Sequence, residues 1–376
     1  MVDIDIAIKS LTRHIERIEV LLRFKYRLYN DFLKSGEEPP YELKRVIEIH
    51  EEELNFAMGL RRNYLSMIED YNVVSYSNPE RHTNIGPNII RYLEYGPTRN
   101  SNSSSTITKN DDNNVKNVVL LHGFTQVAER WSRIIPGLLR KHRRRLRVII
   151  PDIIGFGYGD KPRDVDYTMD FFVHSFLKPF LNNLGISKAC IIGSSFGGQI
   201  AAEFAIEYRD MVEDLILISP AGMMTQSNPV LDRYIAAALY PNAEFQTVYQ
   251  VLTEMVYDPS VVDEQTVRDF VLRMRLPNAK YALTSTIVNM IDGARRLQQS
   301  GRLSSITAPT LIIWGENDRV IPIQYSHGFR QAIPNNKFVV IPMCGHAPHY
   351  ETPGIVNREL SAWRANGWEQ QQQQQD

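Results

Sequence analysis

The sequence predicts an α/β protein with a mainly parallel sheet and a helical hairpin at its N-terminus. Short apolar runs alternate with helical patterns from about residue 88 to residue 365. Several runs are almost entirely Val, Ile and Leu, which is typical of strands covered by helices on both faces of a sheet. This alternation indicates a doubly wound domain. The expected strands are residues 88–95, 117–121, 148–152, 189–193, 215–219, 310–314 and 338–342.

The composition is that of a globular protein and gives no sign of a polyanionic partner. The 376 residues are 43% hydrophobic and carry a formal net charge of −1, so nucleic acid is not an expected ligand. The basic run at 140–147 is short and lacks interleaved aromatic residues, which favours a solvated helix end over a nucleic-acid surface. The 9 histidines are scattered without a Cys/His cluster, so we expect no metal site.

The cysteine usage and the N-terminal segment indicate the compartment. Cys190 and Cys344 are too few for a disulfide framework in a chain of this size, which favours a reducing environment. Charged residues recur throughout the N-terminal segment, so we expect neither a signal peptide nor a membrane span there. We therefore expect a cytoplasmic protein.

Residues 1–75 are expected to form two long helices packed as a hairpin. An apolar seam with steps of three and four residues marks the first helix, and Lys25 interrupts it. Gly36 ends that helix, and the proline pair at 39–40 begins the second. The remaining apolar face of this coiled coil packs on the main domain or on a second copy of the chain, and we expect the second copy and hence a homo-oligomer. The seam consists of Ile4, Ile8, Leu11, Ile15, Ile18 and Leu22.

The other boundaries follow from composition and from segment length. Residues 76–220 form the first part of the main domain, interrupted by a polar, low-complexity stretch at 97–114 that we expect to be disordered. Residues 221–305 show helical patterns without a clear strand and are too long for an ordinary crossover, which indicates an inserted helical cap. Residues 306–366 complete the domain, and the Gln-rich tail at 367–376 is assigned no fold.

A candidate nucleophile lies between an expected strand and an expected helix. Gly193, Ser195 and Gly197 form a G-x-S-x-G pattern directly after the apolar run at 189–193. The chain must reverse direction there within one tight turn, which forces the central residue to the apex, and glycines let the strand and the helix approach closely. We therefore expect Ser195 to be exposed and Ser194 to point back toward the fold.

The base and the acid that would activate this serine are expected on loops after later strands. A serine hydroxyl needs a general base, and that base needs an orienting acid, in the chain order Ser, acid, His. Asp318 follows the strand at 310–314 and His346 follows the strand at 338–342. We expect these two residues to complete a catalytic triad; Glu316 is the alternative acid and His349 the alternative base.

Two backbone N–H groups are expected to stabilise an oxyanion. One belongs to Phe196, which directly follows the candidate nucleophile, and the other to Phe124, in the loop after the strand at 117–121. His122 and Gly123 make the turn of that loop. We expect the His122 side chain to be structural.

Together these motifs resemble the α/β-hydrolase superfamily, in its capped branch. The resemblance rests on "HGF" at 122–124, "PDIIGFGYGDKP" at 151–162, "GSSFGG" at 193–198, "WGENDRVIP" at 314–322 and "GHAPHYE" at 345–351. It implies an eight-stranded, mainly parallel sheet, a cap after the sixth strand, and Ser195, Asp318 and His346 as the triad, with no cofactor.

Within that branch, the cap segment resembles hydrolases that break carbon–carbon bonds in dienoic meta-cleavage products. Those enzymes imply a cap arginine, for which Arg273 and Arg275 are the candidates. The glycine-rich sequence after "HG" and the tryptophan after the catalytic histidine are absent here. We therefore expect a serine hydrolase of carboxylic esters first, a C–C hydrolase second, and a non-catalytic ligand-sensing protein as a third alternative.

The methionines of the expected cap give an indication of how apolar the substrate is. Flexible thioethers suit an adaptable apolar pocket, although they also serve as ordinary core filling. We expect a small-molecule substrate with an apolar acyl or aromatic group. The methionines in question are Met223, Met224, Met255, Met274 and Met290.

Overall fold

The computed structural model describes residues 79–97, 115–139, 145–240 and 245–368, together with isolated positions between 15 and 54. The chain divides into two compact units, Met1–Pro79 and Glu80–Asp376. The stretch expected to be disordered lies outside the described residues except at its first position, and so does almost all of the Gln-rich tail.

The described positions of the first unit are largely helical, and its apolar side chains pack together. Ile18 and Leu22 lie in one cluster with Ile47 of the second segment. Lys25, which interrupts the apolar seam, places its Nζ 3.3 Å from Nε2 of His50. These contacts join the two segments of the expected hairpin, whose other positions lie outside the described residues.

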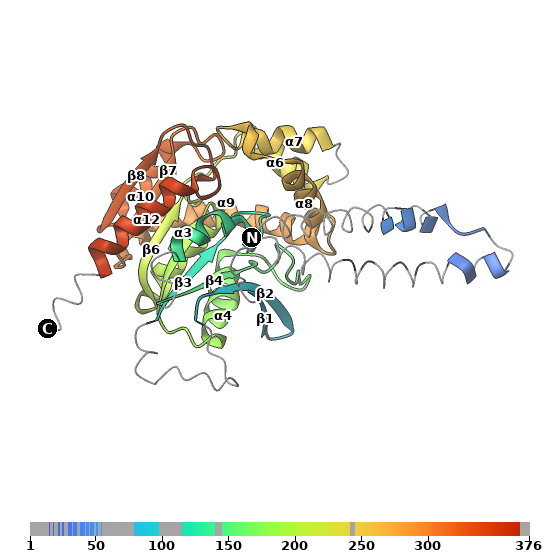
Figure 1. Ribbon diagram of the computed structural model, residues 1–376, viewed down its shortest axis with the longest axis horizontal. Helices are drawn as coiled ribbons and strands as arrows, with labels where there is room; N and C mark the ends of the chain where they lie inside the picture. Colours follow the sequence, from blue (N-terminus) through green and yellow to red (C-terminus); the bar gives the residue numbers. More distant parts are fainter. Residues whose placement is uncertain are drawn as a thin grey trace, which may run out of the picture. The chain divides into compact units, whose positions relative to one another are not determined.

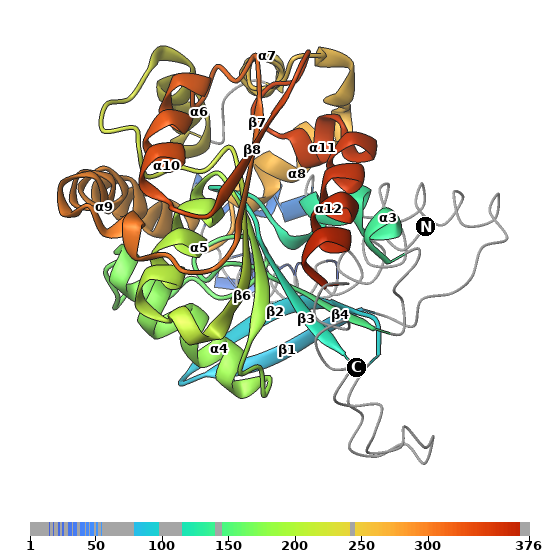
Figure 2. The same cartoon turned by 90° about the vertical axis from the view of Figure 1, so that its left-hand side faces the viewer.

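The second unit is built on a single eight-stranded sheet (Figures 1 and 2). The strand order is β1-β2-β4-β3-β5-β6-β7-β8, and every pairing from β4 onward is parallel, whereas β2 pairs antiparallel with both β1 and β4. The strands are β1 (Glu80–Ile85), β2 (Asn88–Tyr95), β3 (Lys116–Leu121), β4 (Leu146–Pro151), β5 (Ala189–Ser194), β6 (Val212–Ile218), β7 (Thr310–Gly315) and β8 (Asn336–Ile341).

This sheet confirms the predicted fold class, and one strand has no counterpart among the apolar runs. β1 has the sequence ERHTNI and alternates exposed and partly exposed residues along most of its length. It lies at the edge of the sheet and pairs only with β2, so it needs no continuous apolar run. The central strands β3, β4, β5, β6 and β7 are buried along most or all of their length, as their Val, Ile and Leu content predicts.

Helices cover both faces of the sheet (Figure 2). α3, α11 and α12 lie on one face, and α4, α5 and α10 lie on the other. Fully buried aromatic side chains, among them Trp131, Phe172 and Trp314, fill the core between the layers. The helices and helical turns are η2 (Ala128–Ile134), α3 (Ile135–Leu139), η3 (Phe171–Leu177), α4 (Lys178–Asn183), α5 (Phe196–Glu207), η4 (Arg209–Met211), η6 (Arg302–Ser305), η7 (Ile323–Tyr325), α10 (Ser326–Ala332), α11 (Pro348–Glu351) and α12 (Pro353–Trp368).

The segment between β6 and β7, which we call the helical insertion (residues 219–309), contains helices and no strand in its described residues. Asn228 and Asp263 begin two of these helices as N-caps, because their side chains accept backbone N–H groups of the first turn. α6, α7 and α8 contact one another and gather beside one end of the sheet (Figures 1 and 2). The elements are α6 (Pro229–Leu239), α7 (Phe245–Glu254), η5 (Pro259–Val261), α8 (Glu264–Met274) and α9 (Ala279–Ser300).

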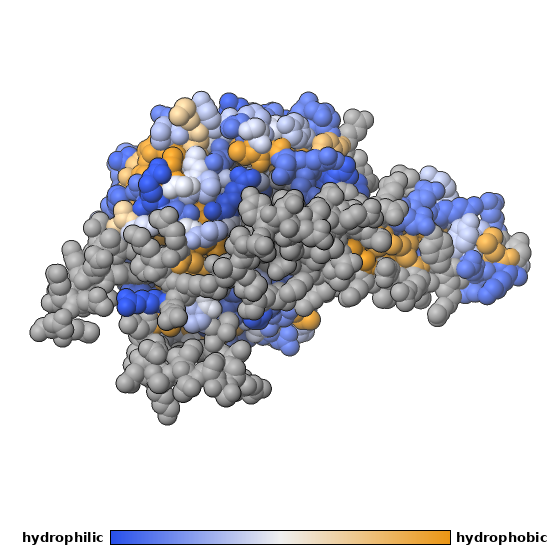
Figure 3. Space-filling model, in the orientation of Figure 1, coloured by the Kyte–Doolittle hydropathy of each residue, from blue (hydrophilic) through white to orange (hydrophobic). Residues whose placement is uncertain are grey.

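The surface is mixed in polarity. Hydrophilic side chains alternate with small apolar patches on the face shown in Figure 3. Single apolar residues such as Tyr240, Val288 and Met343 are exposed. Within the described ranges, no helix has the length and the apolar content needed to cross a membrane.

Candidate active site

The turn between β5 and α5 holds Ser195 in a strained conformation. Its φ of 53° and ψ of −119° lie outside the regions that side chains normally allow. A Cβ on Gly193 would lie 2.3 Å from the carbonyl oxygen of Gly197, and one on Gly197 would lie 2.3 Å from that of Leu121. Only glycine fits at these positions. Ser194 is buried, whereas Ser195 is partly exposed, as the pattern predicts.

The structure brings Ser195, His346 and Asp318 together in one chain of hydrogen bonds. Nε2 of His346 lies 2.9 Å from Oγ of Ser195, and Nδ1 lies 2.8 Å from Oδ2 of Asp318. Oδ1 of Asp318 accepts the N–H groups of Val320 and Ile321, each at 2.9 Å. Because a carboxylate only accepts hydrogen bonds, Nδ1 carries the proton and leaves Nε2 free to accept from the serine hydroxyl.

The alternative base and acid lie elsewhere. His349 is completely buried, and its ring packs on that of Trp131 with 4.3 Å between centroids. Neither ring nitrogen of His349 has a hydrogen-bond partner among the described residues, and burial lowers its pKa to about 3. Glu316 is exposed to solvent. This geometry favours His346 and Asp318.

Glu351 fixes the loop that carries His346. Its carboxylate accepts the N–H groups of Gly345 and Ala347, on either side of the histidine, at 2.8 and 2.9 Å. It also accepts the N–H of Tyr257 in the helical insertion at 2.8 Å. The N–H of His346 itself donates to the carbonyl of Met255, another residue of the insertion, at 2.8 Å. An acidic residue soon after the histidine is the only local signal for this role in the sequence.

The loop after β3 borders the serine. A Cβ on Gly123 would lie 3.4 Å from Cβ of Ser195. His122 holds this loop, since its Nδ1 lies 2.8 Å from the carbonyl oxygen of Gly123 and its Nε2 accepts the N–H of Ile153 at 3.0 Å. Burial lowers the pKa of His122 to about 4, so the ring is neutral at pH 7. These bonds agree with a structural His122.

Phe124 and Phe196 lie side by side at this point. Their rings are 5.8 Å apart in an edge-to-face arrangement. Phe196 is the first residue of α5, so its N–H has no acceptor within the helix. Tyr234 of α6 contacts the same loop, because its hydroxyl donates to the Phe124 carbonyl at 3.1 Å and makes a short hydrogen bond with the Thr125 hydroxyl. The sequence did not predict this contact.

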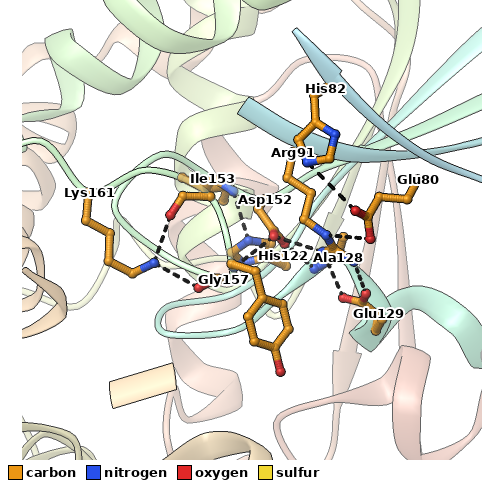
Figure 4. A network of polar contacts seen from close by, with 12 residues as sticks. Glu80, His82, Arg91, His122, Ala128, Glu129, Asp152, Ile153, Gly157 and Lys161 are labelled. Carbon is orange, nitrogen blue, oxygen red and sulfur yellow. Dashed lines mark hydrogen bonds and ion pairs between the residues drawn. The ribbon is translucent and has the colours of Figure 1, made fainter. Parts of the chain in front are cut away.

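A buried ionic network supports the loops behind the site (Figure 4). The guanidinium of Arg91 donates to Glu80 at 3.1 Å, to Asp152 at 2.9 Å and to Glu129. All these residues except Glu129 are buried. Arg91 therefore ties β2 to β1, to the loop after β4 and to the turn that follows β3.

Asp152 is the centre of that network. Burial favours the neutral carboxyl, but Arg91 and His122 together with the N–H groups of Ala128 and Tyr158 hold its pKa below the usual value. Those N–H groups donate at 2.8 and 2.9 Å. The charged carboxylate therefore fixes the ends of β3 and β4 relative to each other.

A cavity of about 260 Å³ opens beside Ser195 and is mostly apolar. An apolar cavity of about 150 Å³ accommodates benzene, so this one has room for a substituted ring or a branched chain. Its wall near the triad includes Phe124, Phe196 and His346. Its apolar lining also includes Met224, Leu231, Ile287, Met290, Ile291 and Val320.

A smaller recess that also borders His346 is positively charged. It has a volume of about 40 Å³ and is lined by Arg130 and Arg273. Arg273 is only 6% exposed, and its Nε has no hydrogen-bond partner among the described residues. Among the described residues, no carboxylate lies within ion-pair distance of either arginine, and the Arg130 guanidinium packs over the Tyr350 ring, 3.7 Å from its centroid. Arg275, the other candidate from the sequence, is exposed.

The two arginines affect the titration of their surroundings. Burial lowers the pKa of Arg130, and the positive charge of Arg273 lowers it further. Burial raises the pKa of Asp269, one turn before Arg273 on α8, to about 6, although Arg273 and a hydrogen bond from Gln265 oppose that rise. The recess therefore carries positive charge without a full counter-charge, which suits an anionic ligand.

Comparison with known proteins identifies the family. A family model described as alpha/beta hydrolase fold matches residues 116–353. The chain belongs to this family. The match spans β3 to the beginning of α12 and includes the whole helical insertion and every residue of the hydrogen-bonded chain at Ser195.

The curated relatives of the chain include hydrolases. It is 28% identical over 273 residues to a 2-hydroxy-6-oxo-6-phenylhexa-2,4-dienoate hydrolase of Burkholderia cepacia, a match that covers 70% of this chain and 93% of that protein. It is 31% identical over 251 residues to a 2-hydroxy-6-oxononadienedioate/2-hydroxy-6-oxononatrienedioate hydrolase of Paraburkholderia phymatum, which covers 65% and 85%. These relatives support a hydrolase and do not favour the ligand-sensing alternative.

Solved structures agree with the fold. A 2-hydroxy-6-oxo-6-phenylhexa-2,4-dienoate hydrolase from Rhodococcus sp. strain RHA1 superposes with a TM-score of 0.64 at 23% identity, over 75% of this chain and 96% of that one. A membrane phospholipase A described as a bacterial virulence factor gives a TM-score of 0.63 at 22% identity, over 86% and 98%.

Proposed function

We propose that this hydrolase cleaves the carbon–carbon bond of 2-hydroxy-6-oxo-dienoic acids, with Ser195 as nucleophile. The observation that carries the proposal is a recess next to the apolar cavity that is lined by the buried Arg273 and the partly exposed Arg130, neither of which is ion-paired with a carboxylate among the described residues. The phenyl dienoic acid in the name of the Burkholderia cepacia relative has a carboxylate at one end and an apolar ring beyond the reacting ketone, whereas the dioate in the name of the Paraburkholderia phymatum relative has a second carboxylate there. The names of the curated relatives support the same substrate class.

The proposed reaction begins with a proton transfer in the substrate. The 2-hydroxyl loses its proton and carbon 5 gains one, which converts the dienol into a 2,6-diketone. Arg273 and Arg130 hold the carboxylate, and the adjacent positive charge favours the enolate that forms next to it. The ketone at carbon 6 then lies toward Ser195 and the apolar group enters the cavity.

His346 and Ser195 carry out the cleavage. His346 removes the proton of the Ser195 hydroxyl, whose oxygen attacks carbon 6, and Asp318 holds the required imidazole tautomer. The N–H groups of Phe124 and Phe196 stabilise the oxyanion. When it collapses, the bond between carbons 5 and 6 breaks and its electron pair forms a dienolate, which His346 protonates. Water then hydrolyses the acyl-enzyme to a carboxylic acid and frees Ser195.

The helical insertion serves as the cap of this site in the proposal. It supplies Arg273 and the apolar residues Met224 and Met290, and Tyr234 contacts the loop of the expected oxyanion hole. A cap built in this way selects the substrate while the sheet supplies the chemistry.

Ester hydrolysis, which the sequence favoured first, is the second candidate. The arrangement at Ser195 and the apolar cavity suit the acyl group of an ester equally well. The two reactions differ in their need for the arginine recess, because a neutral ester has no carboxylate to place there. The recess therefore favours C–C hydrolysis.

Product identification tests the proposal. The purified protein is incubated with 2-hydroxy-6-oxo-6-phenylhexa-2,4-dienoate, and mass spectrometry follows the formation of benzoate and 2-hydroxypenta-2,4-dienoate. We expect both products in equal amounts, and neither from Ser195→Ala. The proposal fails if the dienoate persists while simple p-nitrophenyl esters are hydrolysed, because that result supports an esterase.

A further inference from the structure

The apolar cavity contains one buried polar group that the proposed reaction does not use. Gln199 lies one turn after Ser195 on α5, is completely buried and lines the cavity. Among the described residues, neither its amide oxygen nor its amide nitrogen has a hydrogen-bond partner. Buried amides in folded proteins are nearly always hydrogen-bonded, because an unpartnered one destabilises the fold. Such a group in a ligand cavity points to a partner that arrives with the ligand.

Glycines keep the space around this amide open. Gly222 has a φ of 109°, and a Cβ there would lie 3.3 Å from Cγ of Gln199. Gly293 lies inside α9, and a Cβ there would lie 3.3 Å from Nε2 of Gln199 and 2.9 Å from Cγ of Met169. Glycine inside a helix is less favourable than alanine by about 1 kcal/mol. Its presence at 293 preserves room beside both side chains.

A trapped water is a poor partner for this amide. A buried water generally makes about three hydrogen bonds, and it needs two to four polar partners. Most of the cavity lining is apolar and includes Met290 and Ala294. A water there would gain few bonds beyond those to the amide itself.

We propose that Gln199 is a specificity-determining residue that binds a neutral hydroxyl on the apolar arm of the substrate. A hydroxyl both donates and accepts, so it can pair with the amide oxygen and the amide nitrogen together. A charged carboxylate is less favourable there, because no Lys or Arg among the described residues lines this cavity to offset its lost hydration. The volume of about 260 Å³ exceeds that needed for an unsubstituted ring. The inference rests on the proposed function for the dienoic acid part of the substrate. It adds that the group beyond the ketone is a hydroxylated aryl ring.

The kinetic test compares 2-hydroxy-6-oxo-6-phenylhexa-2,4-dienoate with its 2-, 3- and 4-hydroxyphenyl counterparts. We expect the wild-type protein to prefer one hydroxylated isomer by about tenfold in kcat/KM, which corresponds to one good hydrogen bond. Gln199→Met keeps the unbranched shape and should abolish or reverse this preference. Met290→Leu changes an apolar side chain of the same cavity, and this variant should retain the preference for the hydroxylated isomer. If wild type prefers no hydroxylated isomer, the inference is wrong.

A binding test separates this inference from the proposed function. Acetophenone and its hydroxylated isomers carry the aryl ketone alone, and their affinities for Ser195→Ala are measured by ligand-observed NMR. We expect about tenfold tighter binding of one hydroxylated ketone, and no such gain in Ser195→Ala/Gln199→Met. If the hydroxylated ketone binds more tightly but the wild-type protein does not turn over the dienoate, C–C hydrolysis is rejected and the role of Gln199 stands. Equal affinities for all the ketones, or a preference that survives Gln199→Met, would overturn the role of Gln199. If Gln199→Met does not fold, Gln199→Leu is used in its place.

Discussion

Replacing Arg273 by glutamine should weaken recognition of the acidic substrate selectively. Arg273 is buried and has no carboxylate partner among the described residues, so a substrate carboxylate would supply its missing counter-charge. A hydrogen bond to a charged group contributes about 1.5–3 kcal/mol, which corresponds to a loss of about 10- to 150-fold in kcat/KM. Arg130 remains in the recess, so binding should not be abolished.

The assay compares a dienoic acid with the methyl ester of its carboxylate in wild type, Arg273→Gln and Arg275→Gln. The loss in Arg273→Gln should be confined to the free acid, because only the acid carries the charge. Arg275 is exposed two residues further on and serves as the matched control, for which we expect rates within a few-fold of wild type. An equal loss for the acid and the methyl ester, or an equal loss in Arg275→Gln, would refute the assignment of Arg273.

The same substitution should also raise thermal stability. A buried cation without a partner has a desolvation penalty that the neutral glutamine avoids. We expect Arg273→Gln to raise Tm by about 2–4 °C for each kcal/mol recovered. Reduced activity with increased Tm would indicate a residue retained for binding, whereas reduced activity with reduced Tm would indicate a structural role.

The remaining predictions concern the triad, the oxyanion loop, the recess and the hairpin. Asp318→Asn should lower kcat by about 10⁴-fold because the imidazole then adopts the wrong tautomer. His346→Ala should lower kcat at least as much. Retained activity in His346→Ala, with loss of activity in His349→Ala, would identify His349 as the base. Tyr234→Phe removes the bond to the Phe124 carbonyl and should lower kcat about tenfold with little change in KM; a change in KM alone would contradict this. Asp269, with its pKa raised to about 6, becomes negatively charged as the pH rises and then offsets Arg273, so KM for the acid should rise a few-fold between about pH 5 and pH 7. Asp269→Asn should lack that rise. Deleting residues 1–75 should give a smaller species by light scattering with the rate per site kept within a few-fold, and an insoluble or inactive product would show that the hairpin completes the catalytic unit.

The sheet could be predicted because its central strands are buried on both faces. Their Val, Ile and Leu runs carry that information locally, and the expected strands at 88–95 and 189–193 match β2 and the body of β5. β1 was missed because an edge strand with partly exposed residues has no such run. The strained turn at Ser195 could be predicted for a similar reason, since the glycines around it reflect a local steric requirement.

The support of the site could not be predicted, because it depends on contacts between distant segments. Glu351 binds the N–H of Tyr257, and Tyr234 binds the carbonyl of Phe124, across loops and helices whose packing no local pattern specifies. The choice between Arg273 and Arg275 depended on which face of α8 is buried. The end of that helix carries both arginines within one turn, so only its packing distinguishes them.

A direct competition tests the central claim, that this hydrolase acts on a carbon–carbon bond in an acidic substrate. The wild-type protein receives 2-hydroxy-6-oxo-6-phenylhexa-2,4-dienoate and p-nitrophenyl butyrate together, and the loss of each is followed in the same reaction. We predict that kcat/KM for the dienoate exceeds that for the ester, and that Ser195→Ala consumes neither. Faster loss of the ester, with the dienoate left intact, would contradict the claim and indicate that the protein is an esterase.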